Sequence, residues 1–142
     1  MTAISCTLLV DDDATTNFLN QALLRRTALT DTVLVALDGQ QALDLLRTNC
    51  QDATSTSCPA LILLDLNMPR MNGVEFLEAY AQRRPTQHPA VVIIMLTTSL
   101  NPRDVARMQH LPIAGYLNKP LTKEKIDWIV QEHFDQPAPA AG

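Results

Sequence analysis

The sequence predicts an α/β fold in which helices cover both faces of a doubly wound parallel sheet. Five short apolar runs alternate with stretches of helical period, and the runs at 60–64 and 90–96 are apolar throughout. Continuous apolar runs suit strands that are covered on both faces, as in a parallel sheet. Repeated strand-then-helix units imply right-handed crossovers, which place helices on both sides of one sheet.

The apolar runs and the helical stretches define the elements in order. We expect strands at 6–10, 32–37, 60–64, 90–96 and 113–117. The helical stretches show apolar faces at i, i+3 and i+4 spacing. These faces are Phe18, Leu19, Ala22 and Leu23; Ala42, Leu45 and Leu46; Val74, Leu77 and Ala81; and Ile126, Ile129 and Val130. Pro102 suits a helix start between strands four and five, with Val105 and Met108 as its short apolar face.

Five strand–helix units indicate a flavodoxin-like (βα)5 arrangement with strand order 2-1-3-4-5. The length of 142 residues fits one domain, which we place at residues 1–135. Residues 49–59 are expected to form a long surface loop. The Pro/Ala-rich tail at 136–142 is expected to be disordered.

Composition excludes several classes of protein. A formal net charge of −4 argues against a nucleic-acid binder and against an anionic membrane surface as target. The apolar runs are far shorter than the roughly 20 residues of a membrane span, and no signal peptide is visible. Three cysteines without a CxxC pair favour free thiols in a reducing compartment, although a Cys50–Cys58 disulfide remains open. We therefore expect a soluble cytoplasmic protein.

Polar residues follow the ends of four predicted strands. In chain order they are Asp11, Asp12, Asp13, Asp65, Thr97, Thr98 and Lys119. In an open parallel sheet, ligands bind beyond the carboxyl ends of the strands, so these side chains are expected to converge. Clustered carboxylates repel one another unless a cation lies between them, and an all-oxygen set suits Mg²⁺. A nearby lysine suits a phosphate, so the predicted pocket suits phosphoryl transfer to a carboxylate.

Four motifs in this order resemble response-regulator receiver domains. The segment 8–12 (LLVDD) is similar to the family's acidic pair, and 61–73 (LILLDLNMPRMNG) is similar to its phosphoacceptor strand and loop. The segment 95–99 (MLTTS) matches the switch threonine, and 115–120 (GYLNKP) matches the lysine motif. The resemblance to the family covers about residues 4–134. The segment 96–99 is in addition similar to that of receivers that work with phytochrome-like kinases.

The resemblance implies roles for the acidic residues and the lysine. Asp65 would be the nucleophile that takes the phosphoryl group from a phosphohistidine. Asp12 and Asp65 would ligate Mg²⁺ directly, Asn67 through its backbone carbonyl and Asp11 through a bound water. Lys119 would pair with a phosphate oxygen.

The resemblance also implies a conformational switch. The Thr97 hydroxyl would bind another phosphate oxygen, and Tyr116 would swing inward once Thr97 moves. The Lys119–Pro120 peptide is expected to be cis, which proline makes accessible.

As a whole, the chain resembles the CheY-like, stand-alone response regulators of two-component and phosphorelay systems. It would be a phosphoacceptor switch rather than a turnover enzyme, with slow self-catalysed phosphorylation and dephosphorylation at Asp65. The expected partners are a sensor histidine kinase or a histidine phosphotransfer protein, and an unidentified downstream target. Tyr116 and Trp128 suggest a dimerisation or target surface on the fourth helix, fifth strand and fifth helix.

Two positions depart from the family pattern. Asp13 adds a third consecutive acid, which we expect at the rim of the site, where it could simply cap the first helix. Thr98 is bulkier than the small residue usual beside the switch threonine, and we predict that it narrows access to the acyl phosphate.

Three alternatives compete with this interpretation. Asp11 to Thr15 (DDDAT) also fits a haloacid-dehalogenase-like phosphatase with Asp11 as nucleophile and Asp13 as acid/base, but this leaves Asp65 unexplained. A calcium loop at Asp65 fails because Arg70 stands where glycine is needed. A phosphorylation-independent interaction module would not need the full set of acids, threonine and lysine.

Overall fold

The computed structural model describes residues 4–27, 30–50, 58–83, 91–98 and 102–134. Its five-stranded sheet is parallel, with the order β2-β1-β3-β4-β5. The strands are β1 (Ile4–Val10), β2 (Thr30–Ala36), β3 (Leu61–Asp65), β4 (Val92–Thr97) and β5 (Gly115–Asn118). The predicted fold class and strand order are therefore confirmed. The predicted strand limits differ from the observed ones by at most two residues.

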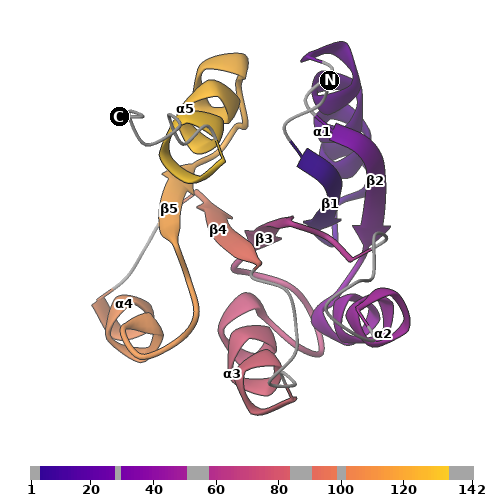
Figure 1. Ribbon diagram of the computed structural model, residues 1–142. Coiled ribbons are helices and arrows are strands. Elements are labelled where there is room, and N and C mark those ends of the chain that lie inside the picture. The colour runs from indigo at the N-terminus through magenta and orange to yellow at the C-terminus, as the bar shows by residue number, and fades with distance from the viewer. Residues whose placement is uncertain (1–3, 28–29, 51–57, 84–90, 99–101, 135–142) are drawn as a thin grey trace, which may run out of the picture.

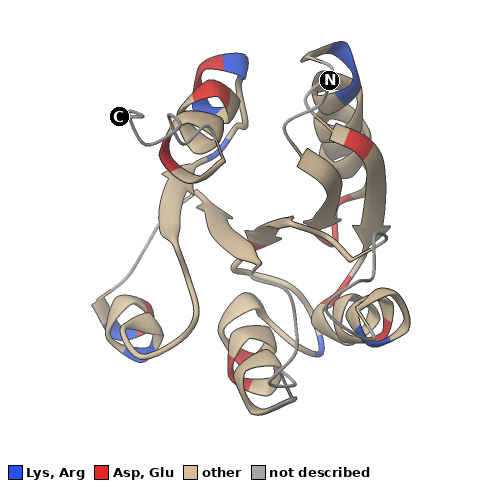
Figure 2. Ribbon diagram, viewed as in Figure 1, with Lys and Arg blue, Asp and Glu red and all other residues tan. Residues whose placement is uncertain are grey.

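Helices cover both faces of this sheet. They are α1 (Ala14–Thr27), α2 (Gly39–Asn49), α3 (Gly73–Arg83), α4 (Pro102–Met108) and α5 (Lys123–His133). Figure 1 shows α2, α3 and α4 on one side of the sheet and α1 and α5 on the other. None of the helices in the described ranges combines the length and the apolarity that crossing a membrane requires. Lys and Arg are spread over α1, α2, α4 and α5 rather than collected on one of these helices (Figure 2).

Successive residues of the central strands enter different cores because strand side chains alternate between the two faces. On β3, Ile62 and Leu64 lie in the cluster beneath α2, α3 and α4. Leu61 and Leu63 lie in the cluster beneath α1 and α5. Every residue of β3 is buried, as the continuous apolar run predicted.

The register of the sheet brings the ends of four strands to one edge. Val10 pairs with Leu64, so β1 and β3 end together. Asp65 pairs with Leu96, and Thr97 pairs with Asn118. The residues that follow these strands therefore begin at nearly the same level.

The predicted apolar face of α1 is wrong. Phe18 and Leu19 are 67% and 59% exposed, whereas Asn17, Asn20 and Leu24 are buried. The Asn17 side-chain amide donates to the backbone carbonyl of Asp11, which compensates part of its desolvation, while its Oδ1 is buried without a hydrogen-bond partner. A polar tertiary contact, rather than the apolar stripe, sets the rotation of this helix.

The other predicted helix faces agree with the structure at most positions. Ala42, Leu46, Val74, Leu77, Ile126 and Ile129 are buried. Ala81, near the end of α3, is exposed. The predicted helix start at Pro102 is confirmed, with Met108 buried at the other end. The strand start at Ala90, most of the 49–59 loop, Ser99 and the 136–142 tail lie outside the described residues.

The prediction of three free thiols is wrong. Cys50 and Cys58 form a disulfide, and their Cα atoms are 4.6 Å apart. Cys50 follows α2 and Cys58 precedes β3, so the packing of this helix beside the sheet brings together two residues that their sequence spacing alone did not pair. Among the described cysteines only Cys6 is free, and burial raises the pKa of its thiol. The cytoplasmic location was inferred partly from free thiols and stays a prediction.

Candidate functional site

The first acidic segment is fixed by backbone contacts at the end of β1. The Asp11 amide donates to the Ala36 carbonyl at 3.1 Å, which continues the pairing of β1 and β2 by one residue. Asp11 Oδ1 accepts from the Asp13 amide at 2.9 Å, and the Asp11 carbonyl accepts from Asn17 Nδ2 at 2.8 Å. Asp11 is buried and Asp12 is exposed. One carboxylate of the pair is thus held inside the site and the next lies at its surface.

Lys119 joins two strand ends that are far apart in the sequence. Its Nζ donates to Asp11 Oδ2 at 2.8 Å and lies 3.1 Å from Asp65 Oδ1. Asp65 is the last residue of β3 and is buried. The Lys119 amide donates to the Thr97 carbonyl at 3.0 Å, which fixes the lysine just beyond β5. The lysine ammonium therefore lies between two buried carboxylates.

Three carboxylates gather around this point. One oxygen each from Asp11, Asp12 and Asp65 lies within 4.8 Å of the others. This separation leaves room for one small cation, and the donors are all oxygen, which suits a hard ion such as Mg²⁺. The chemistry and spacing of the donors therefore fit a divalent metal site. Asn67 follows in the loop after β3 and is exposed; its role as a carbonyl ligand stays a prediction.

The charges in the site shift two pKa values. Burial raises the pKa of Asp65, and the negative charges of Asp11 and Asp12 raise it further, while Lys119 partly offsets them. For Lys119, burial is the largest single influence and opposes the charged form. Its contacts with Asp11 and Asp65 together outweigh burial, so the pKa of Lys119 is raised. The lysine stays protonated, and an additional cation would relieve the crowding of carboxylates.

The two predicted switch residues lie on neighbouring strands. Thr97 ends β4 and is 1% exposed, so its hydroxyl is inside the protein. Tyr116 lies on β5, pairs in register with Met95 and is half-buried. The Lys119–Pro120 peptide is cis, as predicted. The hydrogen bond from the Lys119 amide to the Thr97 carbonyl holds these two residues next to each other. The movement of Thr97 and Tyr116 on phosphorylation stays a prediction.

Asp13 caps α1 instead of joining the carboxylate cluster. Its Oδ1 accepts from the Thr15 amide at 3.0 Å and its Oδ2 from the Thr16 hydroxyl at 2.8 Å. These hydrogen bonds, led by that from Thr16, lower the pKa of Asp13, and the residue is exposed. A carboxylate that stays ionised is a poor general acid, so this arrangement does not favour the phosphatase alternative.

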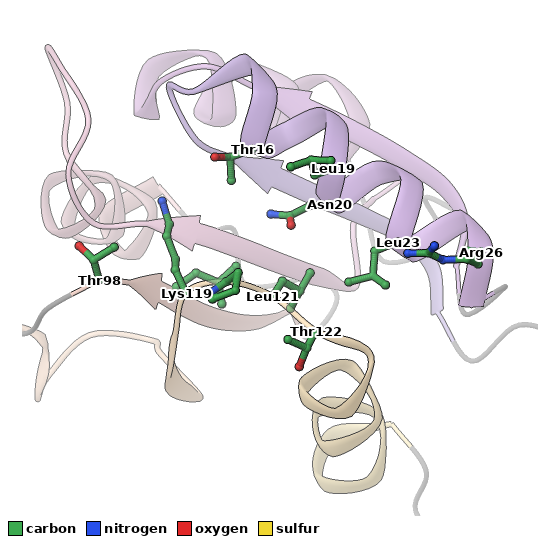
Figure 3. A pocket seen from close by; sticks show the side chains of 11 residues that line it. Thr16, Leu19, Asn20, Leu23, Arg26, Thr98, Lys119, Leu121 and Thr122 are labelled. Carbon is green, nitrogen blue, oxygen red and sulfur yellow. The ribbon is translucent and has the colours of Figure 1, made fainter.

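A cleft of about 530 Å³ opens beside Lys119. Figure 3 shows side chains of α1 on one side of this cleft and Lys119, Leu121 and Thr122 on the other. Its lining runs along α1 from Thr16 to Arg26, past Leu19 and Leu23, and reaches Thr98 at the end of β4. The cleft could not be foreseen from the apolar pattern, because that pattern assigns Leu19 and Leu23 to the core face of the helix.

A contact at the second strand–helix turn was also missed. Arg70 Nη2 donates to Asp38 Oδ2 at 2.9 Å, across 32 residues of sequence. Asp38 also caps α2 by accepting from the Gln41 amide at 2.8 Å. The capping role has a sequence signal, an Asp before a helical stretch. The ion pair has none, because its partners become neighbours only in the folded sheet.

Comparison with known proteins identifies the family. The family model for the response regulator receiver domain matches residues 7–131 of this chain. The chain belongs to this family. The match confirms the resemblance inferred from the four motifs.

The probable methanogenesis regulatory protein FilR2 of Methanothrix harundinacea is 32% identical over 125 residues, covering 88% of this chain and 78% of that protein. A two-component response regulator from Cytophaga hutchinsonii has a similar structure, with a TM-score of 0.76, 28% identity and coverage of 91% and 96%. The structure of the bacteriophytochrome response regulator AtBRR is also similar, with a TM-score of 0.72 and 26% identity. The match covers 96% of this chain and 98% of that one. The chain is thus a receiver domain of two-component signalling with a CheY-like fold.

Proposed function

We propose that this receiver is a Mg²⁺-dependent switch that accepts a phosphoryl group from a phosphohistidine onto Asp65. The observation that carries the proposal is the position of Lys119 between Asp11 and Asp65, with a third carboxylate, Asp12, within 4.8 Å of the other two. Lys119 bridges two buried acids, Asp11 and Asp65, that are 54 positions apart in the chain. Neither a lysine with only a surface role nor an acid with only a helix-capping role explains this contact. Phosphoryl transfer needs these groups together: a carboxylate nucleophile, a cation and a positive side chain.

The chain's own residues would carry the transfer as follows. A carboxylate oxygen of Asp65 forms the new O–P bond as the N–P bond of the phosphohistidine breaks, and the imidazole leaves with the electron pair. Lys119 Nζ exchanges a carboxylate contact for a phosphate oxygen, and the Thr97 hydroxyl binds another oxygen. Because phosphoryl transfer depends on positioning and charge stabilisation, these fixed contacts supply most of what the protein contributes.

The proposed metal ligands are Asp12 and Asp65 directly, the Asn67 backbone carbonyl, and Asp11 through water. When bound, Mg²⁺ would neutralise charge on the transferred group. The exposed position of Asp12 supports this assignment, because a ligand at the surface lets the cation enter without opening the core.

The cleft beside Lys119 supports a protein as the phosphoryl donor. A histidine kinase or a histidine phosphotransfer protein must bring its imidazole to Asp65, and the cleft leads from Lys119 along α1. Phe18 and Leu19, both largely exposed, lie on the same helix. Exposed apolar side chains beside a cleft are typical of a protein-binding surface. We therefore place the donor on α1 and the segment that joins β5 to α5.

We propose that the receiver passes its output to a partner protein. Phosphorylation would reposition Thr97 and Tyr116 and alter the face of α4, β5 and α5, which would bind an unidentified target or a second copy of the chain. Trp128 is 40% exposed on α5, which supports its use in such a surface.

The test incubates the purified protein with Mg²⁺ and acetyl phosphate or a beryllofluoride mimic. The readouts are phosphate incorporation and the fluorescence of Trp128, the one tryptophan of the chain. Asp65→Asn is the test variant, and Asp44→Asn is the matched control, because Asp44 is an exposed acid on α2 outside the site. We expect a Mg²⁺-dependent response in the wild type and the control that is lost in Asp65→Asn.

Other outcomes would contradict the proposal. A response that persists in Asp65→Asn but is lost in Asp11→Asn would favour the phosphatase alternative. No response in any of the proteins would favour an interaction module that works without phosphorylation.

Thr98 offers a second test of access to the site. It is exposed and lines the cleft beside Lys119, so it lies where a methyl group could restrict a water molecule or a donor. We expect Thr98→Ala to raise both the phosphorylation rate and the decay rate of the phosphorylated protein. Rates equal to those of the wild type would remove Thr98 from this role.

A further inference from the structure

The loop between β3 and α3 begins directly at the phosphoacceptor and carries the proposed carbonyl ligand, Asn67. Its end returns to its beginning, because the Gly73 amide donates to the Leu66 carbonyl at 2.9 Å. A Cβ atom at Gly73 would lie only 2.6 Å from the carbonyl oxygen of Asp65, so only glycine permits this approach. The base of the loop is therefore fixed against the end of β3.

The outer part of the loop is held by α2. Asp38 uses one carboxylate oxygen to accept from the Gln41 amide at 2.8 Å and the other to accept from Arg70 Nη2 at 2.9 Å. The Asp38 side chain is 5% exposed, whereas that of Arg70 is 75% exposed. A single buried carboxylate thus serves both the helix N-terminus and the loop, because each of its oxygens accepts one of the two contacts.

Two further features indicate that this contact constrains the loop. Met71 packs so closely on α2 that a Cβ atom at Gly39 would lie 2.7 Å from Met71 Cγ. Arg70 itself has a φ of 67°, in the left-handed region that glycine adopts at least cost. An arginine held in this conformation places its guanidinium on Asp38, which a glycine could not do.

We propose that Arg70 is a positioning residue for the divalent cation: through its ion pair with Asp38 it holds the β3–α3 loop so that the Asn67 carbonyl faces the carboxylate cluster. This role rests on the proposed function. The loop is fixed at Gly73 and at Arg70 and Met71, and Asn67 lies on the stretch between Asp65 and these points. Releasing the outer contact frees this stretch to move without altering any of the three carboxylates.

The effect of removing the Arg70 charge on Mg²⁺ binding distinguishes a positioning role from a purely electrostatic one, because the two roles predict changes of opposite sign. Arg70→Gln removes a positive charge, which by itself would make the surroundings more attractive to a cation. Arg47→Gln makes the same change of charge at an exposed arginine on α2, whose ion-pair partner, Asp44, lies on the same helix. Weaker cation binding in Arg70→Gln, against this electrostatic trend, would therefore report a loss of position.

The experiment titrates MgCl₂ into the unphosphorylated full chain and follows backbone amide signals by two-dimensional NMR, with the thermal midpoint of each variant measured alongside. We expect the Mg²⁺ dissociation constant to rise about threefold to fivefold in Arg70→Gln, in the range of a part-exposed ion pair acting on a ligand one step away. Arg70→Lys should stay within about twofold of the wild type, because it keeps the charge. The double variant Asp38→Asn with Arg70→Gln should lose no more than the larger single loss, since both changes break one contact.

The outcomes distinguish the two proposals. If the wild type binds Mg²⁺ and is phosphorylated, but Arg70→Gln binds Mg²⁺ as well as Arg47→Gln does, the positioning role is overturned and the proposed function stands. A lower thermal midpoint in Arg70→Gln with an unchanged dissociation constant also overturns the positioning role, because the ion pair then serves only stability. If the wild type neither binds Mg²⁺ nor accepts phosphate, the proposed function falls and the positioning role falls with it.

Discussion

The two faces of the sheet differ in how completely helices cover them. Beneath α2, α3 and α4 the buried cluster is continuous and includes the fully buried Phe76. On the other face α1 and the segment that joins β5 to α5 border a cleft of about 530 Å³, and α1 leaves Phe18 and Leu19 exposed. The first face therefore supplies most of the packing, while the second leaves a way to Lys119. Packing that stabilises the domain and the cleft that gives access to Lys119 therefore lie on opposite faces of one sheet.

The largest expected effect tests the closed face. Phe76→Ala should lower the free energy of unfolding by about 3–5 kcal/mol, because it removes a fully buried aromatic side chain and leaves a cavity. Urea denaturation measures this loss. The matched change on the open face, Phe18→Ala, should alter stability by less than about 0.5 kcal/mol. Similar losses in the two variants would contradict the division between the faces.

The disulfide is the second test of the closed face, since Cys50 and Cys58 both belong to its core. Replacing both by serine should cost roughly 2–3 kcal/mol, the chain-entropy value for a loop of this length. A reducing agent should lower the urea midpoint of the wild type and leave that of the double variant unchanged. Alkylation of all three cysteines in denatured, unreduced protein would show that the bond is absent.

A smaller, pH-dependent effect is expected at Asp38. The capping hydrogen bond from Gln41, with help from Arg70, lowers the pKa of Asp38 below its unfolded value. The folded state therefore binds this proton less readily, so the stabilisation is complete above about pH 4 and is lost as the pH falls through the folded pKa. Asp38→Asn keeps a cap but loses the charge, and should cost about 1 kcal/mol at neutral pH.

Urea denaturation at several pH values checks this prediction. The difference between the wild type and Asp38→Asn should shrink as the pH falls below about 4, because the unfolded chain binds the proton first and the folded carboxyl follows only at its lower pKa. A difference that stays constant from neutral pH to about pH 3 would exclude the ionised carboxylate as its source.

The smallest effect sharpens the role of the open face. Phe18→Ala should slow phosphoryl transfer from a histidine phosphotransfer protein about threefold, because it removes an exposed apolar side chain from α1, the helix that lines the cleft. Phosphorylation by acetyl phosphate should not change, since this small donor needs no protein surface. Equal slowing with both donors would place the effect of Phe18 inside the site and not on the docking surface.

The sequence predicted the parts of the fold in which burial and pattern coincide. Residues 61–64 are apolar without interruption because strand β3 is covered on both faces, so both the strand and its central place could be inferred. Asp65 and Lys119 could be placed in one pocket because parallel strands end at a common edge. Neither inference needed a side-chain contact.

Other features depended on contacts that no local pattern carries. The rotation of α1 was misjudged because Asn17 is buried by a hydrogen bond to the Asp11 carbonyl, which makes a polar residue part of the inner face. The Asp38–Arg70 ion pair and the Cys50–Cys58 bond each join residues that meet only once the sheet has formed. In each case a contact made only in the folded chain determines the structure. The spacing of apolar residues and the residue composition do not encode that contact.

The dependence of the site on Lys119 has a consequence for how the chain is made. During synthesis Asp11 and Asp65 leave the ribosome long before position 119, and their carboxylates have no ammonium between them until β5 has been added. A nascent chain that ends before β5 therefore carries mutually repelling acids at the sheet edge. Lys119, which directly follows β5, relieves this repulsion, so these acids gain their ammonium partner only when β5 and Lys119 have emerged.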